Sequence, residues 1–255
     1  MTDKFIEGRI VERVDFTNSL FALRFEADLP NFSAGQYCRA GLFLGDAAPR
    51  VLTLRPYSLV NSPEDRPHEI LLSLVAAAEG GVLSPHLHAL TAGDRLWFGP
   101  RCNGGFTLQK IPPANTLWCF AAGTGIGPFL SLLRSTPTWE KFSQIVLVHG
   151  ARHVPELAYR ERLEALSCRY GQRFRYVSML TGDTHPGSLS GRIPAAITDG
   201  RLIKKTGLML TASDAHCMVC GSTRMVADTV SALMALGLRP HRHDQPGQIT
   251  TEAYG

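Results

Sequence analysis

The sequence predicts a two-domain protein in which a six-stranded antiparallel β-barrel at the N-terminus is followed by an α/β parallel sheet. Up to about residue 105, short apolar runs follow one another with turn residues between them and little helical spacing. After about residue 112, each apolar run is followed by a segment with helical spacing. The domains are placed at residues 1–110 and 111–255, because QKIPPA at 109–114 carries two adjacent prolines that interrupt regular structure.

The individual elements follow from the same periodicities. The predicted barrel strands are FIEGRIVERV, LFALRFEA, GQYCRAGLF, VLTLRPYSLV, EILLSLVA and DRLWFG, and short strands spaced this closely are typical of a barrel. The predicted parallel strands are TLWCFAA, QIVLVHG, FRYVSML and HCMVCG. Helices are predicted in GPFLSLLRS, VPELAYRERLEALSCRYG and TRMVADTVSALMALG, with Gly237 as the C-terminal cap of the last.

Length and composition narrow the classes of protein. The 255 residues are 44% hydrophobic, which suffices for sizeable cores. The first residues lack the apolar stretch of a signal peptide and no run reaches about 18 apolar residues, so we expect a cytoplasmic protein without a membrane partner. The net charge of +4 is spread along the chain and no nucleic-acid-binding module is found, so no nucleic-acid partner is expected. No coiled-coil seam occurs, and a monomer is expected.

The six cysteines predict neither a disulfide framework nor a metal centre, because they are scattered along the chain. Only Cys217 and Cys220 have C-x-x-C spacing, and they lie in a predicted strand whose alternate residues are buried. The four-cysteine spacing of a plant-type iron–sulfur cluster is absent. Any electron carrier is therefore expected to be an organic cofactor or a partner.

A glycine-rich segment follows the first predicted parallel strand and opens a helix. In AAGTGIGPFLSLL, glycines at 123, 125 and 127 let the backbone approach a pyrophosphate or a nicotinamide, and the helix start offers unpaired N–H groups. The spacing is not G-x-G-x-x-G, so a tight structural turn is the alternative.

Three other strand ends in the second half carry candidate residues. Arg152 and Arg192 follow apolar strand ends, where a guanidinium reaches a 2′-phosphate or is simply a solvated charge. Cys220 and Gly221 end HCMVCG at the same predicted crevice, where the thiol packs against a nicotinamide or is a buried structural cysteine.

The first half contains two candidate segments. In RPYS, Arg55 is suited to pair with a phosphate, Tyr57 to lie against a flavin ring and Ser58 to hydrogen-bond a ring nitrogen, although surface and core roles are the alternative. The segment EGGVLSPHL offers two glycines, the Ser84 hydroxyl and a proline that begins a short helix. It is a second candidate phosphate cradle, or a polar loop between strands.

Taken in order, these segments resemble the bacterial ferredoxin/flavodoxin–NADP reductase family nearly end to end. The resemblance is carried by RPYS, GGVLSPHL, LWCFAAGTGIGPFLSLLR, VLVHGARH, GSLSGRIP, CMVCGSTRMVADT and PGQITTEAYG. It implies FAD and NADP(H) as cofactors, an FAD-binding barrel and an NADP-binding α/β domain whose C-terminal tail returns to the flavin. It also implies a flavoenzyme that transfers hydride between NADP(H) and FAD and single electrons between FAD and ferredoxin or flavodoxin.

The resemblance implies roles for residues at matching positions. It places Arg152 and Arg192 at the NADP phosphate, Cys220 with Gly221 at the nicotinamide, and Ser58, Cys220 and Glu252 as catalytic residues, Glu252 as a proton relay. The remaining cofactor contacts that it implies are Arg55, Pro56, Tyr57, Ser58, Leu72, Ser73, Leu74, Val82, Leu83, Ser84, Gly123, Thr124, Gly125 and Tyr254.

The chain departs from the family pattern at two places. Gly182 in SMLTGDTH stands where the family has an arginine, which weakens the preference for NADPH by about 1.5 to 3 kcal/mol. The chain ends in Tyr254-Gly255, where related chains often have a final aromatic residue, so Tyr254 is the candidate to cover the flavin.

Two other functions stay open at this point. One is an NAD(P)H-dependent flavin or ferric reductase, which Gly182 keeps open. The other is a non-catalytic flavin-binding regulatory subunit, against which the intact GTGIG and CG segments argue.

Overall fold

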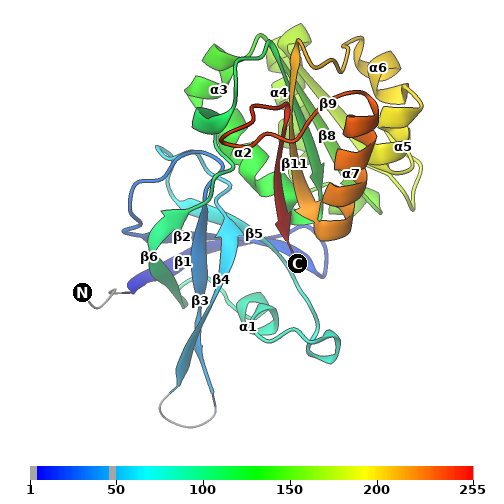
Figure 1. Cartoon of the computed structure of the whole chain (residues 1–255). Helices are drawn as coiled ribbons and strands as arrows, with labels where there is room; N and C mark the ends of the chain where they lie inside the picture. The colour runs from blue at the N-terminus through cyan, green and yellow to red at the C-terminus, as the bar shows by residue number, and fades with distance from the viewer. Residues whose placement is uncertain (1–4, 46–49, 255) are drawn as a thin grey trace. The chain divides into compact units, whose positions relative to one another are not determined.

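The computed structural model describes residues 5–45 and 50–254, which divide into two compact units (Figure 1). Unit 1 comprises the chain up to Thr107 together with Leu130–Ser135, and unit 2 comprises Leu108–Phe129 and the chain from Thr136 onward. The chain therefore passes from one unit to the other three times. Gly255 lies outside the described residues.

Unit 1 is built on a six-stranded antiparallel sheet with the order β4-β3-β6-β1-β2-β5. The two edges meet where Leu59, just after β4, pairs with Ile70 of β5 and the Val60 N–H donates to the Glu69 carbonyl at 2.9 Å. The predicted antiparallel barrel is confirmed. Its strands are β1 (Ile6–Asp15), β2 (Leu20–Ala27), β3 (Tyr37–Leu44), β4 (Val51–Ser58), β5 (His68–Ser73) and β6 (Arg95–Asn103).

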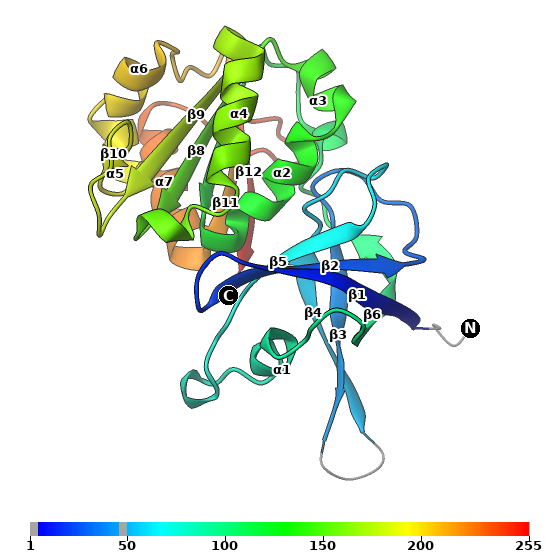
Figure 2. The same cartoon turned by 180° about the vertical axis from the view of Figure 1, so that it is seen from behind.

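Alternating apolar residues of these strands form the core of unit 1. Phe21, Leu23 and Phe25 of β2 point to one face and are fully buried, and the ring of Phe25 stacks on Phe98 at 4.5 Å. Between β5 and β6 the chain makes a long excursion through η1 (Ala77–Glu79) and α1 (Ser84–His88), visible in both views (Figures 1 and 2). The short helix predicted after EGGVL is thus present.

Unit 2 is a six-stranded parallel sheet with the order β10-β9-β8-β7-β11-β12. The strands run outward from β7 to β10, and the chain then returns to place β11 on the other side of β7. This reversal lies between β7 and β11, and in open parallel sheets ligands bind at the carboxyl ends of the strands at such a point. The strands are β7 (Thr116–Ala122), β8 (Gln144–Ala151), β9 (Phe174–Leu180), β10 (Leu189–Ser190), β11 (Ala215–Ser222) and β12 (Ile249–Tyr254).

Helices cover both faces of this sheet, α4 on one face and α5 and α7 on the other (Figures 1 and 2). Trp118 and Phe120 of the central strand are fully buried and stack at 6.0 Å. The helices of the described chain are α2 (Gly127–Leu133), α3 (Thr136–Lys141), α4 (Arg160–Tyr170), α5 (Ile193–Thr198), α6 (Arg201–Thr206) and α7 (Thr223–Ala235), with η2 (Leu108–Lys110), η3 (Gly123–Ile126), η4 (Val154–Glu156) and η5 (Gly171–Arg173).

The helix ends test two predictions. Gly237 follows α7 in a left-handed conformation (φ 85°), and the N–H groups of Gly237 and Leu238 bond the carbonyls of Met234 and Leu233. This is a Schellman motif, so the predicted cap is confirmed. The helix predicted from Val154 begins later, at Arg160, because Tyr159 has a positive φ of 60° and interrupts the helical path.

None of the helices in the described part of the chain is long and apolar enough to cross a membrane. Within the same residues, no group of three or more His, Cys, Asp or Glu side chains is arranged to hold a metal ion. All six cysteines are free thiols, and Cys217 and Cys220 are both buried within β11.

Candidate functional site

The glycine turn after β7 lies against the end of β11. A Cβ at Gly125 would lie 2.7 Å from the Cys220 carbonyl carbon and 2.9 Å from the Gly221 nitrogen, and closer still to the Cys220 carbonyl oxygen. A side chain therefore has no room at Gly125. Gly123, by contrast, has φ 55° and open space around its missing Cβ. The structure thus brings together the GTGIG segment and the Cys220-Gly221 strand end, as the sequence predicted.

The C-terminal strand brings two further predicted residues, Glu252 and Tyr254, beside the end of β11. The parallel register sets Cys220 opposite Glu252 and Ser222 opposite Tyr254. The Cys220 thiol donates to the Tyr254 hydroxyl at 3.2 Å, and that hydroxyl donates to Glu252 Oε1 at 3.4 Å. Burial raises the pKa of the Cys220 thiol, and the carboxylate of Glu252 adds to this although the Tyr254 hydrogen bond opposes it. The thiol therefore stays protonated and acts as a hydrogen-bond donor.

A cavity of about 260 Å³ opens at the carboxyl ends of the parallel strands. It is walled by the ends of β7, β8 and β11, by Thr181 just after β9, and by the starts of α5 and α7. Arg192, predicted from the sequence, lines this cavity. Arg224 and Asp228 of α7 line it too, and sequence reasoning missed both because charges at an exposed helix start resemble solvated surface residues.

Arg152 does not line this cavity, although it was predicted to act with Arg192. Its Cγ lies 3.0 Å from the position that a Cβ at Gly182 would take, and its carbonyl oxygen lies 2.9 Å from that position. The His153 ring is closer still, at 2.7 Å. The chain at Gly182 therefore runs so close to Arg152 that any side chain at position 182 requires the backbone to move.

In unit 1, the RPYS segment forms the second half of β4, an edge strand. Arg55 and Pro56 are exposed, and proline is tolerated on an edge strand such as β4. Tyr57 shares the Arg55 side of the strand and is half-buried, and burial raises the pKa of Tyr57 to about 12. Ser58, on the opposite side, is buried. The exposed side of β4 thus presents one guanidinium beside one phenol ring.

The loop between β5 and α1 is closed by Ser84, whose hydroxyl donates to the Val75 carbonyl and accepts from the Val75 N–H, each at 3.0 Å. A Cβ at Gly81 would lie 2.7 Å from the Val75 carbonyl carbon, so the loop folds back at a position open only to glycine. Val82 stays 61% exposed and Leu83 is buried. The predicted Ser84 hydroxyl is therefore engaged in holding this loop.

The strand segment 72–74 has mixed exposure. Leu72 packs in the core of unit 1, Ser73 is exposed, and the Leu74 N–H donates to the Ser19 carbonyl at 2.7 Å. A ligand beside this strand would meet the Ser73 side chain and the backbone, because the Leu72 side chain points inward.

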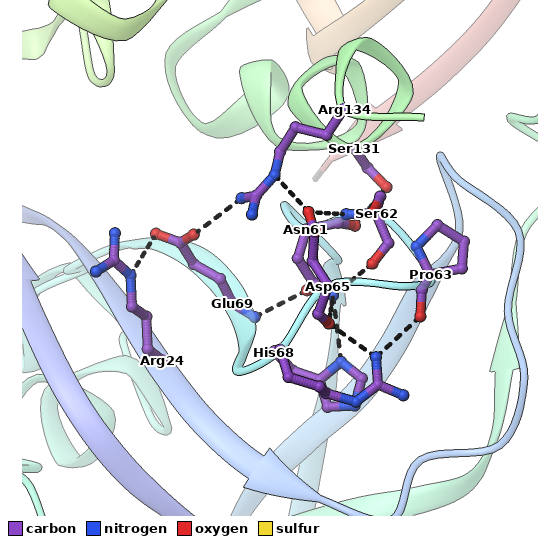
Figure 3. A network of polar contacts seen from close by, with 10 residues as sticks. Arg24, Asn61, Ser62, Pro63, Asp65, His68, Glu69, Ser131 and Arg134 are labelled. Carbon is purple, nitrogen blue, oxygen red and sulfur yellow. Dashed lines mark hydrogen bonds and ion pairs between the residues drawn. The ribbon is translucent and has the colours of Figure 1, made fainter. Parts of the chain in front are cut away.

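Immediately after the RPYS strand, the fully buried Asn61 organises a turn over residues 61–68, called here the Asn61 turn (Figure 3). Its Oδ1 accepts from the Glu69 N–H at 2.9 Å, and its Nδ2 donates to the carbonyls of Ser62 and Asp65 at 2.8 and 3.2 Å. The Asn61 carbonyl accepts from the Ser131 hydroxyl at 2.7 Å. The Asn61 turn is thereby bonded to the segment Leu130–Ser135 of the same unit.

A row of charges reinforces this attachment (Figure 3). The carboxylate of Glu69, 2% exposed, lies between the guanidinium groups of Arg24 and Arg134 at 3.3 and 3.6 Å. Arg134 also pairs with Asp65 at 2.7 Å. Sequence reasoning missed this network, because its members lie far apart along the chain.

Comparison with known proteins agrees with this geometry. Residues 120–231 match the family described as oxidoreductase NAD-binding domain. The flavodoxin/ferredoxin–NADP reductase of Escherichia coli (strain K12) is 36% identical over 251 residues, 98% of each chain, and ferredoxin–NADP reductase A of Sorangium cellulosum is 31% identical over 99% of this chain and 91% of its own. A solved ferredoxin NADP+ reductase of Neisseria gonorrhoeae, with bound FAD and NADP, superposes with a TM-score of 0.90 at 28% identity, covering 98% of each chain.

Proposed function

This chain belongs to the flavodoxin/ferredoxin–NADP reductase family, and we propose on that premise that it exchanges electrons between NADP(H) and ferredoxin or flavodoxin through a bound FAD. The observation that carries the proposal is the switch point of unit 2, where the glycine turn and a buried thiol meet at the carboxyl ends of the parallel strands. When bound, FAD supplies the exchange between two-electron hydride chemistry and one-electron transfer.

The residues of unit 1 fit an FAD. The edge strand β4 offers Arg55 to a phosphate and the Tyr57 ring to the planar face of the flavin. Ser58 is proposed as a hydrogen-bond donor or acceptor at the end of the strand, and Pro56 as a further cofactor contact. The loop residues Val82, Leu83 and Ser84 are proposed along the pyrophosphate, and Leu72, Ser73 and Leu74 beside the flavin.

The residues of unit 2 fit NADP(H). Arg192 faces the cavity with a guanidinium that makes no ion pair among the described residues, and it is proposed to bind a phosphate of the nucleotide. Arg152 is proposed to approach from outside the cavity. Gly123, Thr124 and Gly125 are proposed at the cofactor because their turn has no side chain in the way at Gly123.

The hydrogen-bonded chain from Cys220 through Tyr254 to Glu252 gives the site a proton path. The buried thiol is kept neutral, the Tyr254 hydroxyl both accepts and donates, and the Glu252 carboxylate is half-buried at the end of the chain. We propose that Glu252 exchanges a proton between this hydrogen-bonded chain and the solvent. Cys220 and Gly221 are proposed to contact the nicotinamide, and Tyr254 is proposed to cover the flavin. Ser58 of unit 1 is proposed to hydrogen-bond the flavin ring.

We further propose residues 1–110 as the FAD-binding domain and 111–255 as the NADP-binding domain. A cytoplasmic monomer that binds no nucleic acid is proposed as well. The boundary is supported by the two adjacent prolines of QKIPPA, and the location by the lack of long apolar runs. The monomer is supported by the lack of a coiled-coil seam, and the absence of a nucleic-acid partner by the spread of charge along the chain.

The proposed function is tested with the visible spectrum of the purified protein, before and after anaerobic addition of one equivalent of NADPH or NADH. We expect flavin bands that bleach faster with NADPH, and a protein that then reduces ferredoxin or flavodoxin. A colourless protein that cannot be reconstituted with FAD would refute the proposal. If the flavin bleaches but its electrons pass only to free flavin or ferric chelates, the protein is a flavin or ferric reductase instead. If neither NADPH nor NADH bleaches the flavin bands, the protein is a flavin-binding regulatory subunit.

The phosphate assignment is tested with Arg152→Ala and Arg192→Ala. Each should raise the KM for NADPH far more than the KM for NADH. Arg169→Ala is a matched control, because Arg169 is an exposed arginine of α4 whose guanidinium stacks on Tyr170 and lies outside the cavity. Equal losses with both nucleotides would remove Arg152 and Arg192 from the 2′-phosphate.

A further inference from the structure

The cavity at the carboxyl ends of the strands in unit 2 is small. Its volume of about 260 Å³ is slightly below the range of roughly 300 to 1,000 Å³ typical of small-molecule pockets, and a dinucleotide needs more space than that. The cavity therefore receives one part of a nucleotide. Side chains that face the cavity from different walls must therefore contact the same part of the nucleotide.

Two guanidinium groups face the cavity from separate elements. Arg192 comes from the start of α5, and Arg224 comes from the first turn of α7. The carboxylate that lines the cavity is that of Asp228, one turn further along α7. The cavity thus carries more positive than negative charge among its described lining residues, which favours an anion.

Arg224 is available to a ligand. Its side chain is 82% exposed, and it pairs with Asp228 at a long Nε–Oδ2 distance of 3.8 Å. Exposed pairs of this kind contribute little to stability, so the guanidinium is easily redirected. Arg201 gives the contrast nearby, because it is held by Asp199 at 2.7 Å and by the Ser190 carbonyl at 2.5 Å.

Position 182 supplies no cation, because it is a glycine that lies close against Arg152. At Gly182 a Cβ would lie 2.9 Å from the Arg152 carbonyl oxygen, so the chain leaves no space there for a long basic side chain. Arg152 is proposed to approach from outside the cavity, so a second guanidinium that lines the cavity must come from another wall. Arg224 is the lining residue that meets this requirement.

We propose that Arg224 acts with Arg192 on the 2′-phosphate of NADPH and sets the preference for NADPH over NADH, an inference that rests on the proposed function. A phosphate monoester carries close to two negative charges and accepts the parallel N–H bonds of a guanidinium, so it displaces the Asp228 carboxylate from Arg224. NADH presents a hydroxyl at the same position and leaves the Arg224–Asp228 pair in place. Asp228 thus competes with the phosphate for Arg224 and has no effect on a nucleotide that lacks the phosphate.

The test uses the FAD-loaded protein and two probes, 2′,5′-ADP and 5′-ADP, whose binding is measured by isothermal titration calorimetry. Arg224→Gln should weaken binding of 2′,5′-ADP by about tenfold, while binding of 5′-ADP changes less than twofold. Arg224→Lys, which keeps the charge but loses the planar fork, should fall between the two. Arg169→Gln is the control and should change neither.

Asp228→Asn provides a second variant that does not remove a proposed ligand. It should strengthen binding of 2′,5′-ADP by a few fold, because the competing carboxylate is gone, and leave 5′-ADP unchanged. Equal weakening of both probes in Arg224→Gln, no weakening at all, or weaker 2′,5′-ADP binding in Asp228→Asn would each overturn the proposal. A failure of the proposed function would look different: NADPH would not bleach the flavin of the unmodified protein, whatever the probes do.

Discussion

Replacing Asn61 by alanine should lower the stability of the protein more than most substitutions of a polar turn residue. Asn61 is fully buried and its side chain makes hydrogen bonds to three backbone groups, the Glu69 N–H and the carbonyls of Ser62 and Asp65. Alanine takes away all three and leaves the Glu69 N–H without this acceptor at a buried position. The change therefore adds a desolvation cost to the loss of the bonds themselves.

The magnitude follows from these contacts. Depriving a buried N–H of its acceptor costs roughly 1 to 2 kcal/mol, and each of the two lost bonds to carbonyls costs about 0.5 to 1 kcal/mol. The sum is about 3 kcal/mol. For a chain of this size, 1 kcal/mol corresponds to about 2 to 4 °C in Tm, so Asn61→Ala should lower the Tm by roughly 6 to 12 °C.

The assay is thermal unfolding of the FAD-loaded protein, followed by circular dichroism and by release of flavin fluorescence. Because the Asn61 turn begins three residues after Ser58, flavin release should occur at a lower temperature together with unfolding of the barrel. Asn103→Ala is the matched control, since Asn103 is exposed and its side chain makes a single 3.3 Å bond to the Arg101 carbonyl. If Asn61→Ala melted within 2 °C of the unmodified protein, as the control should, the reasoning would be refuted.

Three further outcomes are expected. Gly125→Ala should keep the flavin spectrum but slow flavin reduction by NADPH more than tenfold in stopped-flow, because its Cβ meets the end of β11; an unchanged rate would contradict this. Iodoacetamide at pH 8 to 9 should alkylate the exposed Cys168 and spare Cys220, whose pKa burial raises, as peptide mass spectrometry would show; equal labelling would contradict the burial. Burial lowers the pKa of His149 from 6.5 to about 4. Between pH 6.5 and about 4 the unfolded chain therefore binds a proton at His149 that the folded protein does not bind. The free energy of unfolding should fall as the pH drops through this range, by up to roughly 1.4 kcal/mol per pH unit. His149→Gln should reduce this slope in urea unfolding at pH 4.5 to 7, and an identical slope would rule the histidine out.

The barrel and the parallel sheet could be predicted because periodicity alone distinguishes them. The run FRYVSML is short and mostly apolar, and it forms the strand Phe174–Leu180 with the predicted bounds. The start of α4 could not be read in the same way. Its helical spacing extends back past Tyr159, and the local sequence does not signal the positive φ at that residue.

Some contacts of the candidate site could likewise be predicted from the sequence, and others could not. The meeting of the glycine turn with Cys220 and Gly221 was predictable, since the carboxyl ends of neighbouring parallel strands converge at one edge of a sheet. The contacts of Cys220 with Glu252 and Tyr254 form because residues 249–254 pair with β11 as the strand β12. The sequence ITTEAY is too short and too polar to predict a strand. The bond from Ser131 to Asn61 joins residues 70 positions apart, and no local pattern signals such a contact.

The division of α2 between the two units has a consequence for engineering and for gene fusion. A fragment that ends at residue 110 would lack Ser131 and Arg134. The barrel would then lose the partners of Asn61, Asp65 and Glu69. A chimera between relatives should therefore keep both ends of these bonds compatible. Chimeras that lose them should express as unstable apoprotein.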